Sequence, residues 1–103
     1  MKTSLTQILS DALLGRKIKL YKVLDKVYEN NISEYFVISV NILRYPPNKC
    51  EIIGETVGII KNLETSFDVY EGDSYTFTIV DENENVLNVH GLHTITAEIE
   101  FLN

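Results

Sequence analysis

The chain has 103 residues, of which 45% are hydrophobic and 23% charged, a composition typical of a globular domain and not of a disordered chain. Eight of the nine Lys and Arg residues lie in residues 1–49, whereas eleven of the fifteen Asp and Glu residues lie in residues 50–103. The net charge of −6 repels nucleic acid at long range, so we do not expect direct binding to DNA or RNA.

Two further features bear on where the protein works. Its only cysteine, Cys50, excludes an intramolecular disulfide and favours a reducing compartment. The first residues lack the apolar centre of a signal peptide, and the apolar runs are far shorter than a membrane span. We therefore expect a soluble, cytoplasmic protein.

The first predicted element is a short amphipathic helix at residues 3–15. Its apolar residues recur at helical spacing and form one stripe: Leu5, Ile8, Leu9, Ala12 and Leu13. Ser4 and Gln7 have the spacing of a capping box, and Gly15 suits the left-handed residue that follows many helices. We expect this helix to plug one end of a sheet or to cover one of its faces.

Residues 16–103 are predicted to form an antiparallel sheet, and its first two strands carry apolar residues on both faces. The apolar phase changes from Ile18 and Leu20 to Tyr21 and Val23, which predicts a bulge or sharp bend near Tyr21. After a turn at 29–31, the second strand alternates between one face and the other. The inward face is Phe36, Ile38, Val40 and Ile42, and the outward apolar residues are Tyr35, Val37 and Leu43. Core packing is the default for this outward stripe, and a partner subunit is the alternative.

Turn signals divide the rest of the chain into short strands. We predict strands at about residues 52–61, 66–70, 74–80, 86–90 and 93–102, separated by turns that include 71–73, 81–85 and Gly91. The predicted fold is mainly β (α+β), a short N-terminal helix followed by a six- to seven-stranded antiparallel barrel or sandwich. Residues 1–103 are expected to form a single domain.

The acidic segment 64–84 is the main candidate for a partner-binding site. It contains seven carboxylates and no Lys or Arg: Glu64, Asp68, Glu71, Asp73, Asp81, Glu82 and Glu84. Most of them lie in or beside predicted turns, and turns at the same end of a β-meander lie close together and concentrate negative potential. The functional interpretation is a surface that docks on a basic, nucleic-acid-binding groove of a protein. The alternative is solubility alone, because acidic turns are common on small domains.

The remaining charged residues have a structural explanation. Lys17 and Lys19 alternate with apolar residues on the first strand, and Glu98 and Glu100 do the same on the last. If these strands are neighbours, the two rows pair across the ladder. The basic run at 16–26 with its interleaved tyrosines has some features of a nucleic-acid surface, but the net charge disfavours that interpretation.

No pattern in the chain predicts catalysis. His90 and His93 have a spacing that suits a metal site on a helix, but in strand and turn these positions face opposite sides, which favours structural histidines. Cys50 has no assigned base, and the chain has no nucleophile elbow and no phosphate-binding glycine loop. We therefore expect no enzymatic activity, no cofactor and no bound metal.

The predicted function is that of a small acidic binding protein that docks on a basic surface of a protein partner and modulates or inhibits it. The chain is similar, in size and charge only, to small acidic phage proteins that inhibit host nucleases or defence systems. One alternative is a structural module that forms a homo-oligomer through a sheet face or edge. Another is an enzyme or metal-binding protein built around His90, His93 and nearby carboxylates.

Overall fold

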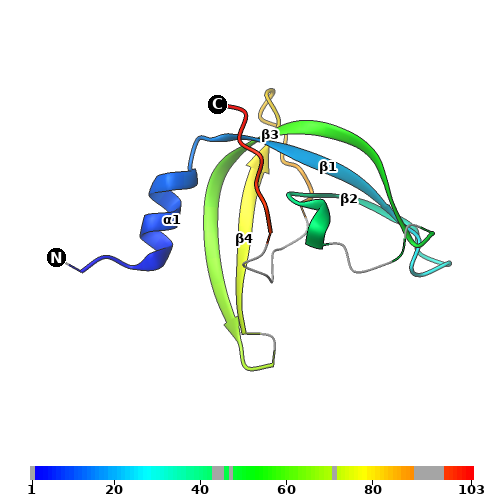
Figure 1. Cartoon of the computed structure of the whole chain (residues 1–103), viewed down its shortest axis with the longest axis horizontal. Coiled ribbons are helices and arrows are strands. Elements are labelled where there is room, and N and C mark those ends of the chain that lie inside the picture. Colours follow the sequence, from blue (N-terminus) through cyan, green and yellow to red (C-terminus); the bar gives the residue numbers. More distant parts are fainter. Residues whose placement is uncertain (1, 43–45, 47, 71, 90–96) are drawn as a thin grey trace.

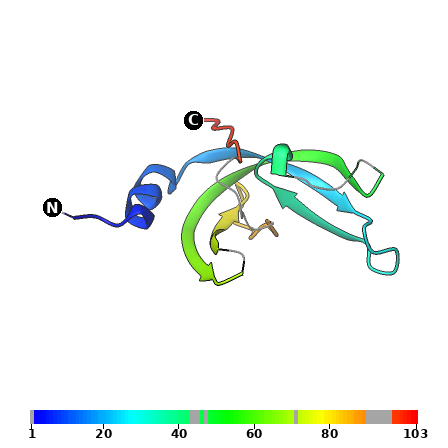
Figure 2. The ribbon, with the colours of Figure 1, turned by 60° about the horizontal axis from the view of Figure 1, so that its bottom comes forward.

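The computed structural model describes residues 2–42, 46, 48–70, 72–89 and 97–103, and of residues 42, 66–68 and 72–74 only the backbone. The described residues form helix α1 (Leu5–Leu13), strands β1 (Lys17–Asp25), β2 (Ser33–Val37), β3 (Cys50–Asp68) and β4 (Gly72–Val80), and a 3-10 turn at Val40–Ile42. The strands form one antiparallel sheet in the order β2-β1-β3-β4, which curls into a half-barrel (Figures 1 and 2). The fold is mainly β, as predicted, but six or seven strands are not confirmed.

The longest strand, β3, joins two strands that were predicted to be separate, and it changes its partner halfway. Its first half pairs with β1 and its second half with β4. The change falls at Ile59, which lies opposite Lys17 on one side and opposite Val80 on the other. The register with β4 then shifts at Lys61, which lies opposite no residue of β4. A bulge of this kind bends the strand and increases its twist, so it contributes to the curl of the sheet.

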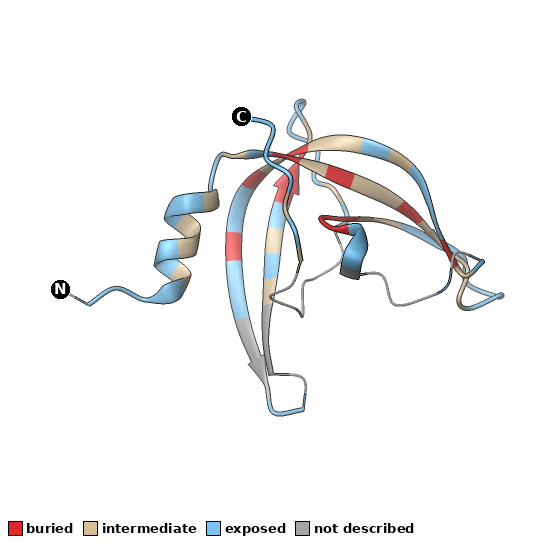
Figure 3. Ribbon diagram, viewed as in Figure 1, coloured by how far each residue is buried: buried red, intermediate tan, exposed pale blue. Residues whose placement is uncertain are grey.

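The main hydrophobic core surrounds this point of partner exchange. Its fully buried side chains are Ile18, Leu20, Ile38, Ile60 and Ile79. Figure 3 colours the buried stretches of the ribbon red. Gly58 lies against this core. A Cβ atom at this position would come within 2.5 Å of Ile79 Cγ2 and 2.7 Å of Leu20 Cδ1. No side chain fits at this position without displacing the core.

A second, smaller apolar cluster explains the phase change in β1. Val23, Val37 and Cys50 are buried in it, and Tyr35 packs against them. The register between β1 and β3 shifts beside Val23, where Ile53 is the extra residue. The predicted irregularity therefore lies close to Tyr21, with the additional residue on β3. The outward stripe of the second strand is core at Val37 and half-buried at Tyr35; its third member, residue 43, lies outside the described residues.

Helix α1 is shorter than the predicted range 3–15 and does not lie in the predicted place. Of the predicted capping box only the Ser4 half is present, because the Gln7 side-chain amide donates to Asp11 Oδ1 (2.7 Å). Ser4 Oγ accepts a hydrogen bond from the Gln7 N–H (3.1 Å), and Gly15 has a φ of 81°. No residue of α1 is buried, and Leu5 and Ile8 are 75% and 51% exposed. The helix lies beside the second half of β3 (Figure 1), and it neither plugs the half-barrel nor covers a face of the sheet.

The outlying position of α1 contributes to an extended shape. The radius of gyration is 14.5 Å, above the value of about 13 Å expected for a compact domain of about 100 residues. No helix in the part of the chain that the structure describes is long and apolar enough to cross a bilayer.

The described residues of the C-terminal part, 86–89 and 97–103, form single bridges where two strands were predicted. Val86 pairs with Val80 of β4, and Val89 pairs with Phe36 of β2, so this segment links the two outer edges of the sheet. Residues 97–103 run along β1, where the Lys19 N–H donates to the Glu100 carbonyl (3.0 Å) and the Leu102 N–H donates to the Lys17 carbonyl (2.8 Å). The first and last parts of the predicted sheet are therefore neighbours. The predicted turn at Gly91 lies outside the described residues.

We expect Gly58→Ala to lower the free energy of unfolding by about 1–3 kcal/mol, because the new methyl group overpacks the core at Leu20 and Ile79. Gly54→Ala is the matched control, since the nearest atom to its new Cβ is Lys22 Cβ at 3.9 Å. Urea unfolding of both variants and the wild type would measure the difference. Equal effects of the two substitutions would contradict the packing described here.

Candidate functional site

The predicted acidic surface does not gather in one place. The turn at Val69–Tyr70 and the turn at 81–85 lie at opposite ends of the nine-residue strand β4, about 30 Å apart along an extended chain (Figure 1). These two turns therefore do not lie together at one end of the sheet. Residue 71 lies outside the described residues, and of Asp68 and Asp73 only the backbone is described.

The loop at 81–85 is held together by the carboxylate of Asp81. That carboxylate accepts hydrogen bonds from the N–H groups of Asn83 (2.8 Å) and Asn85 (2.9 Å) and from the side-chain amide of Asn85 (3.1 Å). These bonds, first of all those from Asn85, hold the pKa of Asp81 below its usual value. Asp81 therefore fixes the shape of the loop and has little hydrogen-bonding capacity left for a partner.

The other two carboxylates of the loop differ in their surroundings. Lys61 Nζ lies 3.8 Å from Glu84 Oε1, so the loop does have a nearby cation, although the acidic segment itself contains none. The pair is largely exposed and contributes little to stability. Glu82 is exposed and forms no ion pair with any residue that the structure describes. Glu64 lies apart on β3, where the Asn62 amide donates to it at 3.4 Å.

Two lysines of β1, and Lys26 directly after it, are paired with acidic residues of the neighbouring segments. The closest pairs are Lys19 with Glu55 (3.1 Å), Lys22 with Glu34 (3.2 Å) and Lys26 with Glu51 (3.6 Å). Lys19 Nζ also lies 3.9 Å from Glu100, which confirms one of the predicted contacts between the first and last strands. Glu98 uses its backbone N–H to bond Ser39 Oγ (3.1 Å). Three of the eight basic residues in 1–49 are therefore neutralised within the fold.

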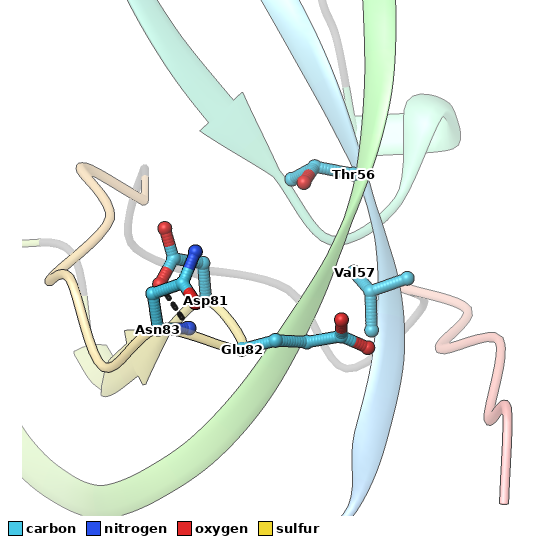
Figure 4. A pocket seen from close by; sticks show the side chains of 5 residues that line it. All are labelled: Thr56, Val57, Asp81, Glu82 and Asn83. Atoms are coloured by element: carbon cyan, nitrogen blue, oxygen red, sulfur yellow. Dashed lines mark hydrogen bonds between the residues drawn. The ribbon is translucent and has the colours of Figure 1, made fainter.

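A depression of about 380 Å³ lies where the 81–85 loop meets β3 (Figure 4). It is lined by Thr56, Val57, Asp81, Glu82 and Asn83. Consecutive strand residues point to opposite faces of a sheet, so a depression that touches both Thr56 and Val57 lies at the edge of β3. β1 occupies one edge, where Leu20 lies opposite Thr56, and the depression therefore opens on the other edge.

The carboxylates of this site were predicted from the sequence, but its two β3 residues were not. Thr56 and Val57 are ordinary strand residues, and only the register of β3 with β4 brings them next to the loop. One sequence feature does indicate where the site lies. Residues 81–85 have a strong turn sequence, which predicts that the preceding strand ends at residue 80.

The other candidate groups are structural or lie outside the described residues. Cys50 is buried, and burial followed by the nearby charge of Asp25 raises the pKa of its thiol, which disfavours the reactive thiolate. The Tyr35 hydroxyl donates to Asp25 Oδ2 at 3.2 Å, and burial raises its pKa. Residues 90 and 93 are not among those described. Elsewhere in the described residues, no three His, Cys, Asp or Glu side chains are arranged to hold a metal ion.

Comparison with known proteins identifies no relative. The chain matches no protein-family model, and no match was found among curated proteins or among solved structures. A functional assignment therefore depends on the geometry of the loop, the depression and the edge of β3.

We expect Asp81→Asn to destabilise the protein above about pH 4 and to have progressively less effect at lower pH. The hydrogen bonds favour the ionised form, so the pKa of Asp81 in the folded state lies below that of about 3.9 in the unfolded state. The stabilisation is thus complete above the unfolded-state pKa and is lost as pH falls through the folded-state pKa.

Urea unfolding of the wild type and Asp81→Asn across this pH range would measure the effect. Glu82→Gln is the matched control, because no described residue holds Glu82 in an ion pair, and it should change the free energy of unfolding little at any pH. A loss for Asp81→Asn that is the same at all pH values would contradict the role of the ionised carboxylate.

Proposed function

We propose that this protein acts by binding, with the 81–85 loop and the adjacent edge of β3 docking on a basic surface of a protein partner. The observation that carries the proposal is Glu82, an exposed carboxylate beside a depression, on a loop that Asp81 holds in shape. Glu84 contributes its charge through an exposed and therefore weak pair with Lys61. Docking of this kind modulates or inhibits the partner by occupying its basic site.

The distribution of charge over the chain supports this proposal. Lys19 and Lys22 of β1 and the adjacent Lys26 are engaged in ion pairs, and the net charge of the chain is −6. A negative field of this kind accelerates encounter with a cationic partner and acts against polyanions. Four acidic residues of the predicted surface lie outside the 81–85 loop and contribute only to the overall negative charge: Glu64, Asp68, Glu71 and Asp73. A groove that normally holds nucleic acid is the kind of basic surface we propose.

The proposal includes no catalytic step and places the protein in the cytoplasm. The buried Cys50 thiol has a raised pKa, so it is a poor nucleophile, and a free cysteine suits a reducing compartment. A binding role needs only a stable fold and an exposed surface, and the loop supplies that surface.

The proposal predicts that a partner captured from a lysate at low salt is lost when Glu82→Gln and Glu84→Gln are combined. Asp81 is left in place so that the loop keeps its shape. The matched control is Glu29→Gln with Glu98→Gln, which removes the same charge from exposed positions outside the loop. Mass spectrometry of the captured proteins at low and high salt gives the readout. Equal retention by both double variants would show that the loop carboxylates do not bind the partner.

A second candidate function is assembly through the edge of β3. Ile52 and Ile53 are each 44% exposed on the half of β3 that pairs with β1 alone, and an exposed edge strand with apolar residues is prone to pair with another copy. Assembly through the outward face of β2 is not favoured, because Val37 is buried.

Sedimentation velocity over a range of protein concentrations separates the two functions. A binding protein of net charge −6 is expected to remain a monomer at micromolar concentration in low salt. A stable oligomer that persists in low and high salt would instead favour assembly, and Ile52→Lys should then dissociate it.

A further inference from the structure

The first half of β3 has one open edge. β1 pairs with it from Cys50 to Ile59, whereas β4 pairs with β3 only from Ile59 onward and ends at Val80. Beyond that point the chain turns away at Asp81, and no strand in the described ranges continues along β3 (Figure 1). Among the described residues, no strand therefore follows the line of β4 beside the first half of β3, and the 81–85 loop borders that line only at Thr56 and Val57.

The hydrogen bonds at the point of partner exchange show which backbone groups face this open edge. The Ile60 N–H donates to the Arg16 carbonyl (3.1 Å), so the N–H and C=O of Ile60 face β1. In an antiparallel strand these groups point alternately to the two edges from one residue to the next. Gly58, two residues earlier, therefore also faces β1, and the N–H and C=O of Val57 and Glu55 face the open edge.

The same assignment follows independently from β4. The Ile79 carbonyl accepts from the Leu87 N–H (2.9 Å) on the outer side of β4, so the N–H and C=O of Val80 face Ile59. Val57 is two residues before Ile59 and points to the same edge. No backbone hydrogen bond from a described residue outside the sheet reaches Val57 at that edge.

Side chains along the edge define what would fit there. The depression at Thr56 and Val57 lies at one end, and the Glu82 side chain extends from the loop toward Val57 (Figure 4). Further along β3, Ile52 and Ile53 expose apolar surface. An extended peptide would meet backbone donors and acceptors, apolar side chains and a carboxylate without a partner cation among the described residues.

We propose that the first half of β3 accepts an extended basic segment of the partner protein as an added strand, with a Lys or Arg of that segment next to Glu82. This inference rests on the proposed function and names the part of the partner that the site binds. Strand addition of this kind takes affinity from main-chain hydrogen bonds and specificity from alternate side chains. A second copy fits less well, because both copies carry a net charge of −6 and the basic strand β1 is paired inside the sheet.

The test uses the wild-type protein and an octapeptide of alternating Lys and Val, acetylated and amidated at its ends. Amide exchange followed by NMR should show Val57 and Glu55 exchanging faster than Thr56 and Gly58 in the free protein, and becoming protected when the peptide is added. The control peptide has the same sequence with an N-methyl group on every residue, which preserves its charge and removes the backbone N–H donors from both of its edges. It should bind at least tenfold more weakly, and Glu82→Gln should weaken the unmethylated peptide by about twofold to fivefold.

The possible outcomes separate this inference from the proposed function. Equal binding of both peptides, or no protection of Val57 at millimolar peptide, would overturn strand addition, while loss of the captured partner in the Glu82 and Glu84 double variant would still support charge-dependent docking. Protection of Val57 that rises with protein concentration alone would show that a second copy occupies the edge, and would also overturn the inference. Protection by the unmethylated peptide only would support it, whatever the lysate experiment shows.

Discussion

The change of partner along β3 is the constraint on which the rest of the structure depends. One strand pairs with β1 up to Ile59 and with β4 from Ile59 onward. On one side of this point, Gly58 has no side chain and so leaves room for the core side chains Leu20 and Ile79. On the other side, the bulge at Lys61 bends the strand. The same arrangement that curls the sheet also leaves the first half of β3 with no described strand on one edge. The candidate site is thus a direct consequence of how the fold is built.

Folding redistributes the charges that are segregated in the sequence. β1 is basic and lies between β2 and β3, so its lysines meet glutamates from both neighbours and from the C-terminal segment. Exposed pairs of this kind contribute about 0–1 kcal/mol each, so they add little to stability. Their larger effect is to remove free cations from the surface. The carboxylates that remain without a described ion pair are spread over the surface, and Glu82 is the one beside the depression.

The features that were predicted correctly are those that local sequence determines. The Ser4 cap and the left-handed Gly15 are set by backbone groups within a few residues, and the phase change between Leu20 and Val23 is visible in the alternation of apolar residues. The continuity of β3 was not predicted, because residues 62–65 are mostly polar. Pairing with β4 holds them in the strand and buries only Leu63, an override of local preference by tertiary contacts.

The site itself could be predicted only in part, for a related reason. Carboxylates can be counted in a sequence, but an open edge is defined by the strand that is missing beside it, and this depends on the register between distant segments. The two components also contribute differently to recognition. The charge of Glu82 attracts any cationic partner and discriminates little between them, whereas the peptide groups of Val57 and Glu55 require an extended backbone. In the proposed interaction, the two components together would select a basic segment that is also free to form a strand, which neither component would select alone.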